Sequence, residues 1–146
     1  MTRWLLLFCL VPVACGAPAD PVKGYQKIWR ANCDAVAECV EQAPEEDWDW
    51  IQTRADECAV AGEVDEAWAE SVRTAVDEGR IIYDRDLAKD CLKAYKDIDC
   101  TTMWDESMLD ACAKYLAGQL QCDETCSIHE ECASGVCRGT MCDCGT

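Results

Sequence analysis

Twelve of the chain's 14 cysteines lie after residue 15, and their pairing constrains the fold more than any other feature of these 146 residues. An even number of cysteines in a short exported chain is typical of a disulfide framework. No two of them are spaced Cys-x-x-Cys, which disfavours a zinc ribbon and a thioredoxin-like redox site. We therefore expect disulfide bonds from Cys33, Cys39, Cys58, Cys91, Cys100, Cys112, Cys122, Cys126, Cys132, Cys137, Cys142 and Cys144.

Residues 1–15 have the pattern of a signal peptide. Arg3 is followed by an apolar run over residues 4–13 that is too short to cross a bilayer as a helix. Cleavage before Cys15 resembles processing at a bacterial lipobox, with Pro12 where such boxes usually carry Leu, and Cys15 would then bear lipid. Cleavage after Ala19, which ends a small-residue site, is the other possibility.

The chain carries 13 basic and 29 acidic residues, a formal net charge of -16 at pH 7. Loss of the signal peptide removes only Arg3, which leaves 12 basic against 29 acidic residues, or -17. This charge disfavours nucleic acid and anionic lipid as partners and favours cationic ones. We expect membrane contact only through lipid on Cys15. High acidity also keeps an exported protein soluble, a role that requires no partner.

Apolar residues recur at helical spacing in five segments, which follow a linker over residues 16–24 that contains Pro and Gly. The predicted helices cover residues 25–42, a segment that begins near Pro44, and residues 64–79, 87–98 and 107–118. Gly79 is expected to end the third helix, and Asp84 or Asp86 to cap the fourth after an extended crossing. The predicted fold is all-α: a small disulfide-stapled bundle of about five short helices over residues 25–121.

Residues 122–146 differ in composition, since six cysteines fall within 23 residues. Ile128, Val136 and Met141 are the sizeable apolar groups besides cysteine, too few for a hydrophobic core. We expect a cysteine-rich, mostly irregular tail that is ordered by cross-links. If its cysteines bond among themselves, 15 connectivities are possible.

His129 is the only histidine and lies between Cys126 and Cys132. These three residues could form part of a metal site, but thiols of an exported chain normally oxidise, and three soft ligands need a fourth. Residues 41–70 contain 11 acidic residues, which could hold calcium or a basic peptide, or could be the solvated side of two helices. We expect no metal and no cofactor.

Trp48 and Trp50 are candidates for partner contact. Two residues apart on a helix, they lie about 200° apart around its axis, so both cannot face one core. An exposed tryptophan beside Asp47 and Asp49 could anchor a partner or pack on the tail.

The order of elements resembles that of exported cysteine-rich lipoproteins of myxobacterial type. The residues that carry this resemblance are Cys33 and Cys39, residues 79–84 leading to Cys91 and Cys100, and Cys112 before the cysteine-rich end. Residues 126–137 also resemble the cysteine-rich N-terminal module of Dickkopf proteins. The resemblance implies an envelope or secreted location and a binding or structural role, with no catalytic residue.

The sequence therefore predicts a non-catalytic exported protein, either an outer-membrane or cell-surface lipoprotein or a secreted protein, with a structural or protein-binding role. An alternative is a secreted inhibitor or effector that uses the tail as a binding scaffold. A hydrolase with a pair of acidic residues is a third hypothesis, but neighbouring motif residues mark no such pair. The partner would be a protein or another cationic species.

Overall fold

The computed structural model describes residues 17–42, 52–53, 55–58, 64–100 and 110–145. Its helical elements are α1 (Pro21–Cys39), η1 (Val40–Gln42), α3 (Glu66–Asp77), α4 (Arg85–Lys96), α5 (Asp110–Lys114) and η4 (His129–Glu131). Its strands are β1 (Ile81–Tyr83), β2 (Leu116–Gly118), β3 (Cys137–Arg138) and β4 (Met141–Cys142). A small helical, disulfide-rich fold is confirmed. The predicted helix near Pro44 lies largely outside the described residues, and no described helix is long and apolar enough to cross a bilayer.

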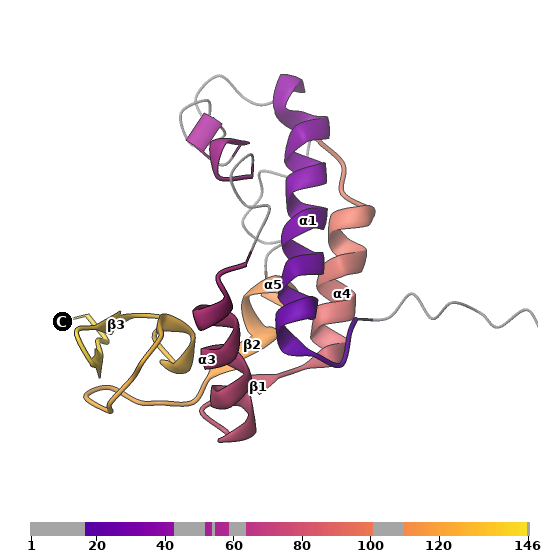
Figure 1. Ribbon diagram of the computed structural model, residues 1–146. Helices are drawn as coiled ribbons and strands as arrows, with labels where there is room; N and C mark the ends of the chain where they lie inside the picture. The colour runs from indigo at the N-terminus through magenta and orange to yellow at the C-terminus, as the bar shows by residue number, and fades with distance from the viewer. Residues whose placement is uncertain (1–16, 43–51, 54, 59–63, 101–109, 146) are drawn as a thin grey trace, which may run out of the picture.

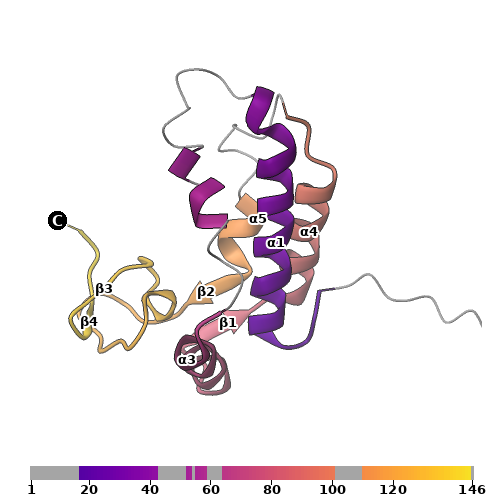
Figure 2. The same cartoon turned by 45° about the horizontal axis from the view of Figure 1, so that its top comes forward.

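Helices α1 and α4 lie side by side and run in the same direction (Figures 1 and 2). Near their N-terminal ends, the Tyr83 hydroxyl donates a hydrogen bond of 2.8 Å to the backbone oxygen of Pro18. Near their C-terminal ends, a disulfide joins Cys39 to Cys100. Gly24 allows Tyr83 to approach α1 closely, because a Cβ at residue 24 would collide with the Tyr83 ring.

We call the described residues from 17 to 118, which include α1, α3, α4, α5, β1 and β2, the body. Its hydrophobic core has two clusters. The first joins α1, α4 and α5 through Ala17, Ile28, Ala88, Cys91, Leu92 and Tyr115. The second, between α1 and α3, consists of Val22, Ala69 and Val72 with Trp68 packed against it. Burial raises the pKa of Tyr115 far above its usual value, so its hydroxyl stays uncharged at physiological pH.

Three disulfides staple the helical body. They join Cys33 to Cys58, Cys39 to Cys100 and Cys91 to Cys112. Each is expected to add about 2–4 kcal/mol by restricting the unfolded chain. None of the three reaches a cysteine beyond residue 112, so the body is cross-linked without the tail.

The fold is not all-α, because β1 and β2 form an antiparallel pair in which Ile82 lies opposite Ala117. The predicted fifth helix over residues 107–118 is therefore wrong at its end, since α5 stops at Lys114 and the chain continues as β2. Apolar residues up to Leu116 fit a helical period. Leu116–Gly118 nevertheless form a strand, because they pair with β1. Ile82, which lies opposite Ala117, is 35 residues earlier in the chain.

The linker predicted over residues 16–24 is too long, because α1 begins at Pro21. The Asp20 carboxylate accepts a 3.0 Å hydrogen bond from the Lys23 N–H, and Pro21 occupies the first turn, where an N–H has no partner to lose. Ala17 is buried in the first core cluster. The segment before α1 is therefore part of the folded body.

Asp20→Ala is expected to lower the free energy of unfolding by about 1 kcal/mol at neutral pH, through loss of the helix cap. The Lys23 N–H, and after it Arg73, lower the pKa of the Asp20 carboxyl from its usual 3.8. A lowered folded-state pKa means that the carboxylate's contribution is complete above about pH 4 and is lost as the pH falls through the folded-state value. Urea unfolding of both proteins should show a difference that shrinks in acid. A difference independent of pH would contradict this assignment.

Candidate functional site

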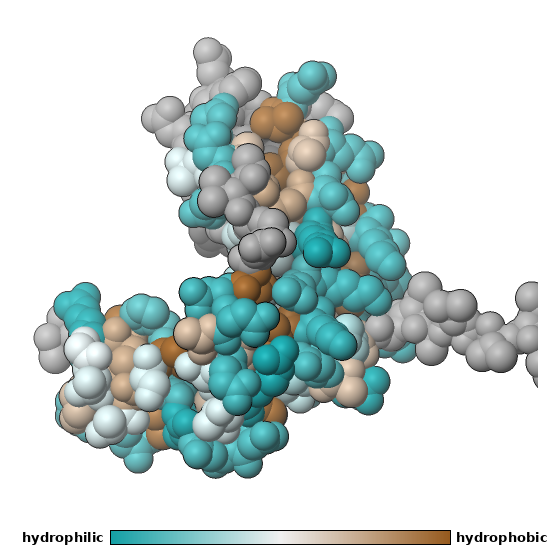
Figure 3. Space-filling model, viewed as in Figure 1, coloured by the Kyte–Doolittle hydropathy of each residue, from teal (hydrophilic) through white to brown (hydrophobic). Residues whose placement is uncertain are grey.

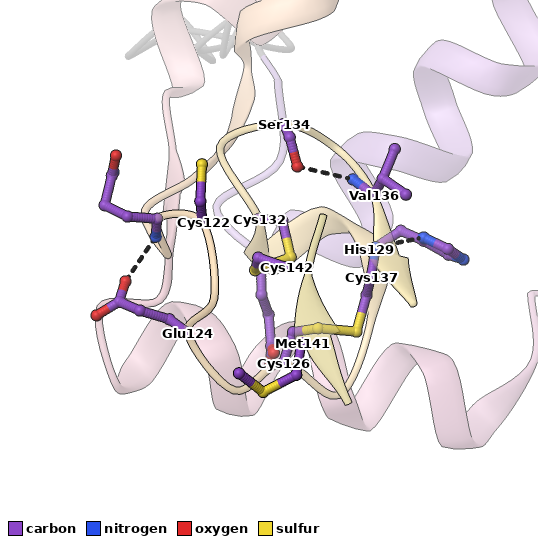
Figure 4. The surroundings of a disulfide bond; sticks show 12 residues. Cys122, Glu124, Cys126, His129, Cys132, Ser134, Val136, Cys137, Met141 and Cys142 are labelled. Atoms are coloured by element: carbon purple, nitrogen blue, oxygen red, sulfur yellow. Dashed lines mark hydrogen bonds between the residues drawn. A yellow bond between two sulfur atoms is a disulfide. The ribbon is translucent and has the colours of Figure 1, made fainter. Parts of the chain in front are cut away.

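The tail, residues 122–145, holds three disulfides, and Figure 4 shows the part of it around Cys126, Cys132, Cys137 and Cys142. The three disulfides join Cys122 to Cys144, Cys126 to Cys137 and Cys132 to Cys142. Cys126, Cys132 and Cys142 form a buried cluster of their own, and the β3–β4 hairpin closes over it. The tail cysteines thus bond among themselves, and cysteine sulfurs replace the apolar side chains that this segment lacks.

The tail docks on the body through an ion pair between a buried carboxylate and a partly exposed guanidinium. Glu131, which is 0% exposed, pairs with the guanidinium of Arg80 at the start of the β1 segment. Its second carboxylate oxygen accepts a 2.7 Å hydrogen bond from the Ser127 N–H. Both oxygens of this carboxylate therefore have partners, one from the body and one from the tail, as a buried charge requires.

Further contacts surround the ion pair. The Trp68 indole N–H donates a 3.1 Å hydrogen bond to Glu130, and Ile128 packs against the cluster between α1 and α3. The backbone of Leu120 donates to Glu131 and accepts from Ala133, at 2.9 Å each. These contacts hold the tail in one position relative to β2.

An open cleft of about 450 Å³ lies at this junction. The body contributes Ala113, Leu116, Ala117 and Gly118, and the tail contributes His129, Glu130, Cys132, Ala133, Ser134 and Gly135. Small side chains line most of the cleft, and His129 and Glu130 are its ionisable groups. The arrangement is suited to an extended backbone or a slender side chain, which small walls admit.

The side chains of His129 and Glu130 are both held by hydrogen bonds from residues that do not line the cleft. The Nδ1 atom of His129 accepts a 2.9 Å hydrogen bond from the Cys137 N–H, so the neutral ring carries its hydrogen on Nε2 (Figure 4). Trp68 fixes one carboxylate oxygen of Glu130. The cleft can thus offer an imidazole donor and a carboxylate acceptor in defined positions.

The sulfurs of Cys126, Cys132 and Cys137 lie within 4.8 Å of one another. Each belongs to a disulfide, which leaves no thiolate to bind a metal ion. His129 is exposed, and its Nδ1 is already bonded to the Cys137 N–H.

Several predicted site residues lie outside the described residues, namely Cys15, Trp48 and Trp50. Much of the acidic segment 41–70 is also outside; its described acidic members are on the surface, namely Glu41, Asp56, Glu57, Asp65, Glu66 and Glu70. The ion pair of Arg80 with Glu131 was not predicted from the sequence. Glu131 stands beside Glu130 in a polar tail, and nothing local distinguishes the buried carboxylate from its neighbour.

The disulfide between Cys122 and Cys144 should be the first to open under a mild reductant. Both of its cysteines are exposed, whereas each of the other five disulfides has at least one cysteine that is buried or partly buried. Access of the attacking thiolate limits exchange. Timed reduction, alkylation and peptide mass mapping should label these two cysteines before any other. Earlier labelling of Cys126 or Cys132 would contradict the described packing.

Comparison with known proteins gave no relative: no protein-family model, no curated protein and no solved structure matches this chain.

Proposed function

We propose that this chain is a non-catalytic exported protein, anchored in the cell envelope by lipid on Cys15 or secreted, that binds another protein at the cleft between body and tail. The observation that carries the proposal is the cleft itself. Two separately cross-linked parts form its walls, and an ion pair holds them together. A cleft preformed in this way binds with little loss of conformational entropy.

Six disulfides in a chain of this size support export, because oxidising compartments are where such bonds form and persist. They also supply a stability that a small apolar core alone would not provide.

The segment before α1 favours cleavage before Cys15 over cleavage after Ala19. The later cut would remove Ala17 from the core and Pro18 from its hydrogen bond with Tyr83. Cleavage before Cys15 retains both. Intact mass spectrometry of the purified protein should find a chain that begins at Cys15 with a lipid adduct. A mature N-terminus at Asp20 would reject the anchor.

A cationic segment of a protein is the partner class that we propose for the cleft. Glu130 offers a partly exposed carboxylate there, in a chain of net charge -16. Small walls and an imidazole donor would accommodate a peptide backbone beside a Lys or Arg side chain.

Capture of envelope and secreted proteins by the immobilised, oxidised chain tests this proposal. Ala133→Arg places a long side chain in the cleft, and Thr140→Arg makes the same charge change at an exposed turn outside it. Partners that bind the wild type and the Thr140 variant but not the Ala133 variant would support the cleft. Equal capture by all three proteins would exclude it.

The carboxylates at the junction have structural partners, which supports a binding role over a hydrolase with an acidic pair. Glu131 is buried against Arg80, and Trp68 holds Glu130. Within the described residues no hydrogen bond joins Ser134 to His129, the combination that would suggest a nucleophile with its base.

An inhibitor or effector that uses the tail alone is less favoured, since Ala113 and residues 116–118 supply one wall of the cleft. The isolated, oxidised tail should not compete with the whole chain for its captured partner.

A further inference from the structure

Basic residues form one row on α1 and another on α4. The rows are Lys23, Lys27 and Arg30 on α1, and Arg85, Lys89, Lys93 and Lys96 on α4. Spacings of three and four residues keep each row on one side of its helix. All seven residues are exposed, and they are seven of the chain's 13 basic residues. We call these seven residues the basic face.

The two rows turn to the same outer side of the molecule. On α1, Gly24 and Ile28 lie toward α4, and on α4 Ala88 and Leu92 lie in the shared core. Cys91 turns toward α5 through its disulfide with Cys112. The two helices run parallel, and on each helix the basic row lies next to the side that packs on the other helix. Both rows therefore face away from α5. Figure 3 shows mainly hydrophilic residues over this part of the molecule.

Few acidic groups neutralise the basic face. Lys93 pairs with Asp97, but among the described residues no ion pair holds Lys23, Arg30, Lys89 or Lys96. On α1 the exposed acids Asp34 and Glu38 follow the basic row toward the C-terminus. On α1 the positive charge is therefore concentrated toward the N-terminal end, whereas on α4 the basic row continues to Lys93 and Lys96 in the last turn, with the exposed acids Asp86 and Asp90 on the same helix.

Ala17, the first described residue, lies at the N-terminal end of the α1–α4 pair. Arg85 donates a 3.3 Å hydrogen bond to the backbone oxygen of Ala17, two residues after Cys15. We infer that the basic face contacts the phosphates of anionic lipid headgroups in the membrane that holds the anchor. The site of anchoring rests on the proposed lipidation, whereas the affinity of the face does not.

The proposed contact departs from the sequence-based expectation that the chain's acidity disfavours anionic lipid. Net charge describes the whole molecule, but at 0.1 M salt charges act over only about 10 Å. An anionic membrane next to the basic face therefore interacts mainly with the seven basic residues, because salt screens its interaction with acidic residues elsewhere on the protein. Lipid on Cys15 would hold the protein at the membrane, and the basic face would determine its orientation there.

Sedimentation with vesicles tests the basic face without the anchor. The protein for this test is the chain from Gly16 onward. It keeps every described residue and lacks Cys15, the residue proposed to carry lipid. We expect it to sediment with vesicles of phosphatidylglycerol and phosphatidylcholine in equal parts, at low salt, and not with vesicles of phosphatidylcholine alone. Added salt should release it.

Matched variants assign the binding to the basic face. Lys23→Gln with Lys27→Gln, and Lys89→Gln with Lys96→Gln, should each lower the partition coefficient by about 25-fold, at roughly fivefold per basic residue. Lys114→Gln with Arg138→Gln makes the same change in net charge outside the face and should have little effect. Circular dichroism and an absence of free thiols would show that all variants are folded.

Equal sedimentation with both kinds of vesicle, or equal losses in the face and control variants, would overturn the inference. Binding to heparin or DNA with none to anionic vesicles would assign the face to a soluble polyanion instead. The mass of the wild-type N-terminus tests lipidation of Cys15 separately. A chain without lipid and a basic face that does not bind vesicles can therefore be told apart.

Discussion

Glu131→Gln is expected to lower the free energy of unfolding by about 2 kcal/mol, because it removes the charge that accepts from the Arg80 guanidinium, which keeps Glu78 as its other partner. The amide oxygen can still accept from Ser127, so the loss reports the charge rather than the shape. Urea unfolding of the oxidised protein measures it. Glu130→Gln, one residue away and partly exposed, should cost about 1 kcal/mol or less.

A double-mutant cycle separates the pair from its surroundings. Arg80→Met combined with Glu131→Gln should cost clearly less than the sum of the two single changes, because Arg80→Met alone leaves the buried Glu131 carboxylate without its counter-charge. Additive losses would mean that the two residues stabilise the protein independently, and the docking described for the tail would then be wrong.

Gly118→Ala should destabilise the full chain by about 2–3 kcal/mol. A Cβ at this position would lie 2.6 Å from the carbonyl carbon of Glu131 and still closer to the carbonyl oxygen of Cys132. Those atoms are backbone, fixed by the disulfide of Cys132 with Cys142, so a side-chain rotation cannot relieve the contact. Urea unfolding with a mid-transition read by tryptophan fluorescence would measure the loss.

The same substitution in a chain that ends at Gln121 is the control. This shorter chain keeps the three disulfides of the body and lacks the backbone that the new Cβ would strike. It should retain helical circular dichroism and a cooperative transition, and Gly118→Ala should change its stability by no more than about 0.5 kcal/mol. A large loss in the short chain would show that Gly118 is needed by β2 itself.

Local signals predicted the helices best. The third and fourth predicted helices match α3 and α4 to within about two residues, and Asp84 caps α4 through the N–H groups of Asp86 and Leu87. Gly79 has a positive φ of 74° where α3 ends, as its place in the sequence suggested. Capping residues and apolar periodicity act within one or two turns, so one sequence is enough to recognise them.

Contacts between distant residues were not predictable in this way. β1 pairs with β2 across more than 30 residues, and the short strand has too few residues for an alternating pattern to outweigh a helical one. The start of α1 was a different kind of error. Asp20 followed by Pro21 is a standard helix beginning, but Gly24 suggested a linker, whereas the structure uses it to bring Tyr83 close.

The basic face could have been recognised in part. The spacing of Lys23, Lys27 and Arg30 is visible in the sequence, as is that of Arg85 and Lys89. A net charge of -16 directed attention to acidic surfaces instead. That the two rows share one surface follows from the parallel packing of α1 and α4, which periodicity within either helix does not reveal.

The charge order along α1 gives this helix an electrical polarity. A helix is stabilised by acids in its first turn and bases in its last, yet α1 has neither; Lys23 lies at its start and Glu38 near its end. Within α1 these side chains add to the helix dipole, and the Asp20 cap offsets part of their effect. On α4, Asp86 in the first turn and Lys93 and Lys96 in the last turn oppose the dipole. In the field above an anionic surface, the seven exposed basic side chains on one side of the molecule produce a torque that turns the basic face toward the surface. Rotation would thus precede contact, and the approach itself would select the basic face.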